Sequence, residues 1–168
     1  SLDDVCSYCL TEPGSGSDAA ALKTKATITN EGYSLNGSKS FISGGGFSDL
    51  YVVLCRTGDQ TPNGISMVLV EDGQSGLSFG KKEQKMGWKA QPTAIVQFDN
   101  CSIPASNLVG EEGAGFKYAM EGLDGGRLNI AAASLGGAQK SYQIAKAYSK
   151  ERSAFGKPIS SFQSIEFK

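Results

Sequence analysis

The first two thirds of the chain consist of short runs of β-branched and aromatic residues that recur about every 10 to 15 residues. Turn signals rich in glycine, asparagine and proline separate these runs. Together they predict an antiparallel β domain, either a sandwich or a small barrel. The predicted strands cover residues 21–29, 33–43, 50–57, 65–71, 77–85 and 93–102.

From Glu111 onward the apolar residues repeat at the period of a helix. Phe116, Met120 and Leu123 predict a short helix, which the sequence Asp124-Gly125-Gly126 interrupts. We expect Asp124 to be the N-cap of a second, long helix, because its carboxylate can accept hydrogen bonds from the first-turn amides. The apolar stripe of that helix runs from residue 128 to 148, and we expect residues 156–158 (Gly-Lys-Pro) to end it.

The change of period divides the chain into two parts. We expect residues 1–110 to form a β-barrel domain and residues 111–168 to be the beginning of a helical domain, giving an α+β multi-domain protein. A long helix with an apolar face cannot bury that face against a small β domain alone. The chain is therefore expected to be a fragment of a longer protein.

Composition removes several classes of function. The chain has 168 residues, a net charge of −1 and no histidine, which excludes Ser-His-Asp triads, Cys-His dyads and histidine-ligated zinc. A net charge near zero gives no general attraction to nucleic acid, and no apolar run is long enough to span a membrane. The four cysteines form only one CxxC pair, at Cys6 and Cys9. We expect all four to be buried, free and structural, with no metal site.

The densest cluster of candidate chemistry is residues 8–18, Tyr-Cys-Leu-Thr-Glu-Pro-Gly-Ser-Gly-Ser-Asp. Glycines allow backbone amides to approach a ligand closely, and hydroxyl groups add further donors. The run is neither a Walker A loop nor a GxGxxG turn that opens a helix. On spacing alone it is either a ligand-binding loop or a plain solvated turn.

This run resembles the acyl-CoA dehydrogenase signature, and three further blocks resemble the same family in the same order. They are residues 38–44, residues 100–116, and residues 151–157 together with Gln163. The resemblance covers the whole chain and implies the middle β-barrel domain and the start of the C-terminal helical domain of an FAD-dependent enzyme. Within the family it is greatest to the isobutyryl-CoA dehydrogenase branch, through residues 51–58, 76–83, 87–93 and 122–130.

The resemblance implies a set of residues that contact FAD. They are Tyr8, Cys9, Leu10, Thr11, Gly16, Ser17, Phe41, Ile42, Ser43, Arg152, Phe155, Phe162 and Gln163. The Thr11 hydroxyl and nearby amides would bond the polar edge of the flavin ring, where neutral donors stabilise negative charge. Arg152, Phe155 and Gln163 match residues that reach the FAD of a neighbouring subunit, so the resemblance also implies a homotetramer.

The resemblance implies acyl-CoA contacts at Ser17, Leu123, Asp124 and Arg127. Without the resemblance, Asp124 would be read as a helix cap and Arg127 as a surface ion-pair partner. The family reaction needs a carboxylate base, which most members carry later in the helical domain. A minority carry it immediately before the arginine that matches Arg127, where this chain has Gly126. We therefore assign no catalytic residue, and we expect these 168 residues alone to be inactive.

The function implied is dehydrogenation of a short branched acyl-CoA such as isobutyryl-CoA in valine degradation, with electrons passing to electron-transferring flavoprotein. Family members work in the mitochondrial matrix of eukaryotes or the cytoplasm of bacteria. Three alternatives stay open. They are a straight-chain or 2-methyl-branched-chain dehydrogenase, a relative of the acyl-CoA or nitroalkane oxidases that gives electrons to oxygen, and a β-barrel binding or assembly module without catalysis.

Overall fold

A computed structural model describes residues 4–168, which divide into two compact units at Glu121/Gly122. The first unit contains a β-sheet and the start of a long helix, and the second contains the rest of that helix and a short hairpin. The expected domain boundary near residue 110 stays a prediction.

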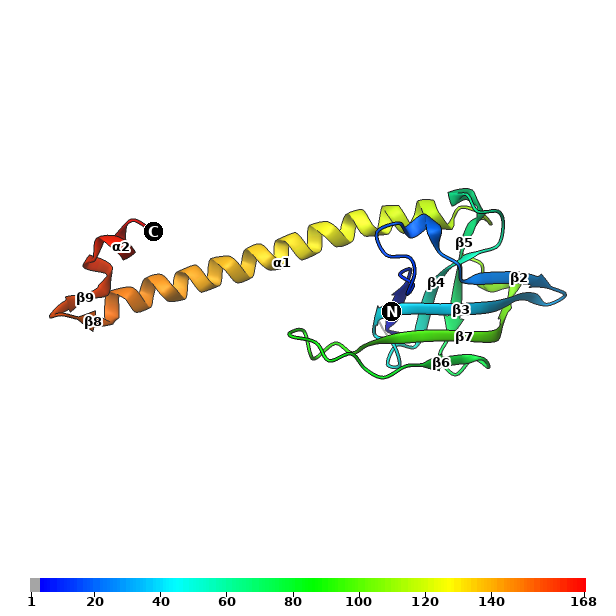
Figure 1. The fold of residues 1–168 in the computed structure, drawn as a ribbon, viewed down its shortest axis with the longest axis horizontal. Helices are drawn as coiled ribbons and strands as arrows, with labels where there is room; N and C mark the ends of the chain where they lie inside the picture. The colour runs from blue at the N-terminus through cyan, green and yellow to red at the C-terminus, as the bar shows by residue number, and fades with distance from the viewer. Residues whose placement is uncertain (1–3) are drawn as a thin grey trace. The chain divides into compact units, whose positions relative to one another are not determined.

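The first unit is built on a seven-stranded sheet. Its strands are β1 (Cys6–Cys9), β2 (Lys25–Thr29), β3 (Gly32–Ser43), β4 (Leu50–Arg56), β5 (Ile65–Glu71), β6 (Leu77–Phe79) and β7 (Thr93–Pro104). The order is β1-β4-β2-β3-β7-β6, and β5 pairs with β4. β3, β7 and β6 lie next to one another in Figure 1. Short 3-10 turns at Ala19–Ala21, Pro62–Gly64 and Ala105–Asn107 connect the strands.

Alternation along the strands produces one core. Leu35, Val53, Val68 and Val96 are completely buried, and they come from four different strands that face the same interior. Cys9, Cys55 and Cys101 are also completely buried, as expected, whereas Cys6 is exposed, contrary to the expectation. Cys6 alternates with the buried residues of β1 and so points to the other face of the sheet.

The sheet is mixed, which corrects the expectation of purely antiparallel strands. β1 and β4 are parallel, with Cys6 opposite Leu50 and Cys9 opposite Val53. β1 was not among the predicted strands, because its four residues adjoin the glycine-rich run and are too few to show a period. Two predicted strands are also shorter in the structure, since β2 begins at Lys25 and β6 ends at Phe79.

The helical segment is one continuous helix, α1 (Gly115–Glu151), so the predicted interruption at Asp124-Gly125-Gly126 is wrong. Asp124 lies inside the helix and pairs with Arg127 one turn later, at 2.8 Å. A glycine inside a helix costs about 1 kcal/mol relative to alanine, which weakens a helix without ending it. Asp124 is therefore not an N-cap.

The helix ends at Glu151, earlier than predicted. Beyond it, β8 (Ser153–Ala154) and β9 (Lys157–Pro158) form a hairpin, followed by a 3-10 turn at Ile159–Ser161 and a short helix, α2 (Gln163–Glu166). Phe155 and Gly156 occupy the two turn positions with φ of 54° and 79°. Positive φ at both positions is the requirement of a type I′ hairpin turn. None of the helices within residues 4–168 has a stretch long and apolar enough to cross a membrane.

Candidate functional site

The structure brings together the two separate sequence motifs that were predicted to contact a flavin. The chain at residues 7–11 runs beside the end of β3, residues 40–43. The Ser7 hydroxyl donates to the Ser43 carbonyl at 2.7 Å, and the Ser40 N–H donates to the Thr11 carbonyl at 2.8 Å. These two bonds fix the relative position of the motifs, which are about 30 residues apart in the sequence.

The glycine-rich run forms a tight turn after β1. Glu12 and Ser15 exchange backbone hydrogen bonds of 2.9 and 3.2 Å, and the Ser15 hydroxyl donates to the Asp18 carbonyl at 2.6 Å. Gly14 and Gly16 have no heavy atom within 4 Å of the position where a Cβ would lie. With Gly16 and Ser17 both exposed, the backbone of this turn is open to the approach of a ligand.

Thr11 presents hydrogen-bond donors that nothing in the described residues satisfies. Its carbonyl is taken by Ser40, whereas neither its N–H nor its hydroxyl has a partner within residues 4–168. The residue is half-buried. A neutral N–H and a hydroxyl on the same residue suit an acceptor edge such as that of a heteroaromatic ring.

Phe41 is held in an unusual backbone conformation at the end of β3. Its φ is 57°, and it lies in a bulge where the pairing register with β7 shifts between Lys39 and Ile42. A left-handed conformation is uncommon for a bulky residue and costs energy, and such residues cluster at functional sites. The bulge keeps the Phe41 ring 66% exposed while Ile42 is buried.

Tyr8 lies on the same run and is 38% exposed. Its hydroxyl donates to the Ala119 carbonyl at 3.4 Å, and burial raises the pKa of Tyr8 to about 12. The side chains of Cys9, Leu10 and Ile42 are buried in the core. Cys9 and Ile42 are 0% and 2% exposed, so any contact of these two predicted residues with a ligand is made by backbone atoms.

The site also contains a buried ion pair that the sequence did not single out. Lys39, completely buried on β3, contacts the Glu12 carboxylate at 2.8 Å and donates to the Leu10 carbonyl at 3.1 Å. Glu12 also accepts the backbone N–H groups of Lys23 and Thr24 at 2.7 and 2.9 Å. The signal available in the sequence was a lysine in the same alternation as Tyr33 and Leu35, which are inward positions of this strand.

Charge and hydrogen bonds decide the ionisation of this pair. Burial acts to raise the pKa of Glu12, but the charge and the hydrogen bonds of Lys39, with the further donors to the carboxylate, outweigh burial and lower that pKa overall. Burial lowers the pKa of Lys39, and the Glu12 carboxylate opposes that effect. Because Glu12 is ionised at neutral pH, the contact is an ammonium–carboxylate pair held under the turn.

The remaining predicted cofactor residues lie in the second unit. Phe155, at the turn of the hairpin, is 96% exposed, and its ring is 6.2 Å from that of Phe162 in an edge-on arrangement. The Lys157 ammonium lies 4.4 Å from the centre of the Phe162 ring. Gln163 follows at the start of α2, and Arg152 precedes the hairpin with its side chain exposed. The hairpin thus gathers four predicted residues in one small region.

The predicted acyl-CoA contacts fall in both units. Leu123, Asp124 and Arg127 lie within one turn of α1, where Leu123 is half-buried and the Asp124–Arg127 pair is largely exposed. Ser17 lies in the first unit and is exposed on the glycine-rich turn.

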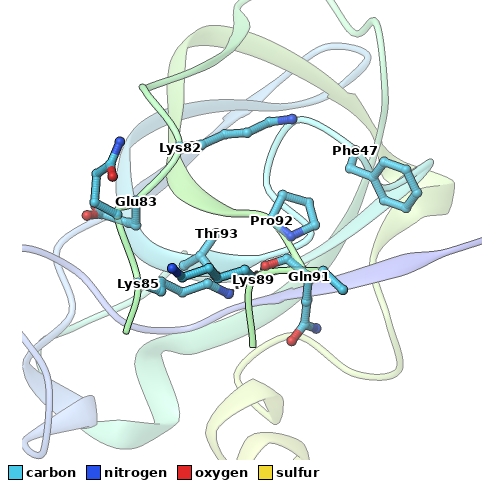
Figure 2. Close-up of a pocket in the computed structure, with 10 residues that line it drawn as sticks. Phe47, Lys82, Glu83, Lys85, Lys89, Gln91, Pro92 and Thr93 are labelled. Atoms are coloured by element: carbon cyan, nitrogen blue, oxygen red, sulfur yellow. Dashed lines mark hydrogen bonds between the residues drawn. The ribbon is translucent and has the colours of Figure 1, made fainter. Parts of the chain in front are cut away.

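Two adjacent cavities, which share Phe47, Gln91 and Pro92 in their walls, open beside the loop between β6 and β7. One, of about 430 Å³, is lined by Ser43, Ser48, Phe47 and Trp88 among others. The second, of about 470 Å³, is lined by three lysines, and Figure 2 shows Lys82 on one side of it and Lys85 and Lys89 near Thr93 on the other. None of the predicted site residues belongs to this lysine-rich wall.

Comparison with known families gives two matches that follow one another along the chain. Residues 7–101 match the acyl-CoA dehydrogenase middle domain. Residues 113–168 match the acyl-CoA dehydrogenase C-terminal domain.

Two of the curated relatives are isobutyryl-CoA dehydrogenases. The chain is 55% identical to a mitochondrial isobutyryl-CoA dehydrogenase of Bos taurus over 99% of its length, and 54% identical to that of Dictyostelium discoideum over 100%. It spans 40% and 41% of the lengths of these two relatives.

Solved structures show the same fold. Butyryl-CoA dehydrogenase from Megasphaera elsdenii superposes with a TM-score of 0.93 at 46% identity, covering 98% of this chain and 43% of the other. A chain from a structure described as the electron transferring flavoprotein of Acidaminococcus fermentans gives 0.93 at 47% identity, with coverage of 98% and 43%. An acyl-CoA dehydrogenase from Bacillus anthracis complexed with FAD gives 0.87 at 34% identity, with coverage of 95% and 27%.

Proposed function

Because the chain belongs to the acyl-CoA dehydrogenase family, we propose that the protein is an FAD-dependent dehydrogenase of a short branched acyl-CoA. The observation that carries the proposal is the pairing of the segment from Tyr8 to Ser17 with the end of β3. Through that pairing, the unsatisfied donors of Thr11 and the exposed aromatic ring of Phe41 lie in the same region of the molecule.

The residues of the first unit fit a flavin ring. Thr11 supplies an N–H and a hydroxyl for the polar edge of the ring, and Phe41 and Tyr8 supply aromatic surface. The open backbone at Gly16, with the Ser17 hydroxyl, suits the pyrophosphate, because amide and hydroxyl donors bind phosphate oxygens without adding charge. FAD, when bound, supplies the hydride acceptor of the reaction.

The hairpin of the second unit has a separate part in the proposal. Phe155 is 96% exposed at the tip of a turn, beside the ring of Phe162, so it is costly to leave in water and is suited to contact another surface. We assign Arg152, Phe155, Phe162 and Gln163 to the FAD of a neighbouring subunit in a homotetramer.

Isobutyryl-CoA is the proposed substrate, supported by the identity of 55% to a relative that carries this name. Ser17, Leu123, Asp124 and Arg127 are assigned to the acyl-CoA. No catalytic base is assigned among the described residues. Electron-transferring flavoprotein is the proposed electron acceptor, and the place of action is the mitochondrial matrix in a eukaryote or the cytoplasm in a bacterium.

An anaerobic reduction assay tests the proposal. The intact protein is loaded with FAD and mixed with isobutyryl-, 2-methylbutyryl-, isovaleryl- or butyryl-CoA, while the absorbance of the oxidised flavin is followed. Isobutyryl-CoA is expected to bleach the flavin fastest. The substrate proposal fails if butyryl-CoA is preferred, and the dehydrogenase proposal fails if FAD binds but none of the four bleaches it.

The fate of the electrons needs a second assay. After bleaching, the reduced protein is mixed either with oxygen or with oxidised electron-transferring flavoprotein. A dehydrogenase passes its electrons to the flavoprotein and reoxidises slowly in oxygen. Fast reoxidation by oxygen alone would favour an oxidase.

A further inference from the structure

Two consecutive residues of β3, Lys39 and Ser40, bond to three consecutive residues of the glycine-rich run, Leu10 to Glu12. The Lys39 ammonium bonds the Leu10 carbonyl at 3.1 Å and the Glu12 carboxylate at 2.8 Å. The Ser40 N–H bonds the Thr11 carbonyl at 2.8 Å. With both carbonyls turned toward β3, the Thr11 N–H and hydroxyl are the groups left to face outward.

The Glu12 carboxylate also connects the run to the chain that leads into β2. Glu12 accepts the N–H groups of Lys23 and Thr24, which immediately precede that strand. The ammonium and the carboxylate therefore connect the run both to β3 and to the chain entering β2. Three anchors on one short turn leave it little freedom to move.

Stability alone is a weak reason for such a pair. Removing an ammonium and a carboxylate from water costs energy that their attraction barely recovers, and well-packed apolar residues can replace buried pairs without loss. Lys39 is completely buried and Glu12 is 8% exposed, so both pay this cost. An apolar pair, however, could not hold the Leu10 carbonyl in place. The pair therefore supplies a fixed orientation, which packing alone would not supply.

We propose that Lys39 and Glu12 are positioning residues for the flavin site, acting through Thr11. This inference rests on the proposed FAD binding. Their ion pair holds the chain from Leu10 to Glu12 so that the Thr11 N–H and hydroxyl point at the polar edge of the ring before the cofactor arrives. Neither charged group touches the cofactor.

The test is a cycle of variants in the intact protein, measured by FAD affinity. Lys39→Met keeps the length of the side chain and removes the ammonium, and it is expected to weaken FAD binding by about tenfold. Thr11→Val removes the hydroxyl that the pair positions. In the Thr11→Val background, Lys39→Met is expected to weaken binding by no more than about threefold, since residues that act as a unit are not additive.

A matched control separates positioning from general loss of stability. Arg56 is a second buried cation of the same sheet, 4% exposed, which bonds backbone carbonyls of other loops and not those of Leu10 or Thr11. Arg56→Met is expected to lower the melting temperature of the FAD-free protein at least as much as Lys39→Met does. Its FAD affinity is expected to stay within about twofold of that of the unsubstituted protein.

A spectroscopic reading reports the positioning directly. The carbonyl stretching frequencies of the bound flavin, measured by Raman spectroscopy, rise when hydrogen bonds to its polar edge are lost. Lys39→Met and Glu12→Gln are expected to raise them in the same direction as Thr11→Val, and Arg56→Met is expected to leave them unchanged.

The proposal is overturned if Lys39→Met weakens FAD binding equally in both backgrounds, or if it lowers the melting temperature without changing affinity or the flavin frequencies. If the unsubstituted protein binds FAD and either result follows, only the positioning role fails. If the unsubstituted protein does not bind FAD, the proposed function and this inference fail together.

Discussion

Phe41 provides a test in which the structure reverses an ordinary order of stability. At a regular strand position, glycine is less stable than alanine by about 0.5–1 kcal/mol, because it loses more backbone freedom on folding. Phe41 has a φ of 57°. In this left-handed region a residue with a Cβ is destabilised by about 1–2 kcal/mol, whereas glycine is not.

The two substitutions to compare are therefore Phe41→Ala and Phe41→Gly. Both remove a ring that is 66% exposed, so the loss of burial is the same in each and below about 1 kcal/mol. The conformational terms differ, since the left-handed cost of about 1–2 kcal/mol exceeds the glycine entropy of about 0.5–1 kcal/mol. Phe41→Gly is expected to be the more stable variant by about 0.5–1 kcal/mol.

Urea unfolding of the FAD-free protein measures this difference without a contribution from the cofactor. FAD titration of the same two variants is expected to show equally weakened binding, because both lack the ring. If Phe41→Ala is as stable as Phe41→Gly, or more stable, the argument from the bulge is refuted. Unchanged FAD affinity in both would remove Phe41 from the site.

Four further outcomes follow from the structure. Arg56→Met is expected to lower the free energy of unfolding by roughly 3 kcal/mol in urea titrations, since it leaves the carbonyls of Leu22 and Ala20 without a donor. A loss below about 1 kcal/mol would contradict this expectation. The Glu12 pKa is lowered from 4.5 in the folded state, so its ionised form contributes stability above pH 4.5 that is lost as the pH falls through the lowered pKa. Glu12→Gln should therefore reduce stability at pH 7 and flatten its decline below pH 4.5, as measured by urea unfolding across a pH series. Asp124→Ala should lower the free energy of unfolding by less than about 0.5 kcal/mol, because its ion pair is exposed. Gly125→Ala should raise it by about 1 kcal/mol, because alanine is the better helix former. A loss of about 1–2 kcal/mol for Asp124→Ala in thermal unfolding would instead indicate that Asp124 is an N-cap.

The strands that could be predicted are those whose alternation is long enough to show a period. The strand predicted over residues 65–71 coincides with β5, and the strand predicted over 33–43 begins one residue late relative to β3. β1 was missed because it has only four residues beside a glycine-rich run. Its pairing with β4 is a long-range contact, which no local pattern contains.

The helix shows the opposite error, in which a local signal was given too much weight. Asp124-Gly125-Gly126 has the composition of a helix start, yet α1 continues through it. Glycine lowers helix stability without forbidding the helical conformation. The Asp124–Arg127 pair bridges the predicted break at one helical turn.

The candidate site was predicted through a resemblance, and the structure adds its physical organisation. Thr11 and Phe41 were named from the sequence. The hydrogen bond from the Ser40 N–H to the Thr11 carbonyl and the left-handed backbone of Phe41 are features that only the structure shows. The Glu12–Lys39 pair joins residues 27 positions apart. Sequence alone could show that Lys39 is an unusual inward lysine, and it could not show its partner.

The central claim is that the run from Tyr8 to Ser17 and the end of β3 hold one flavin between them. A crystal structure of the intact protein with FAD tests it most directly. The account predicts the polar edge of the ring against the Thr11 N–H and hydroxyl, with Phe41 and Ser43 beside the ring. A flavin bound elsewhere, such as in the lysine-lined cavity of Figure 2, with the Thr11 donors left facing solvent, would contradict it.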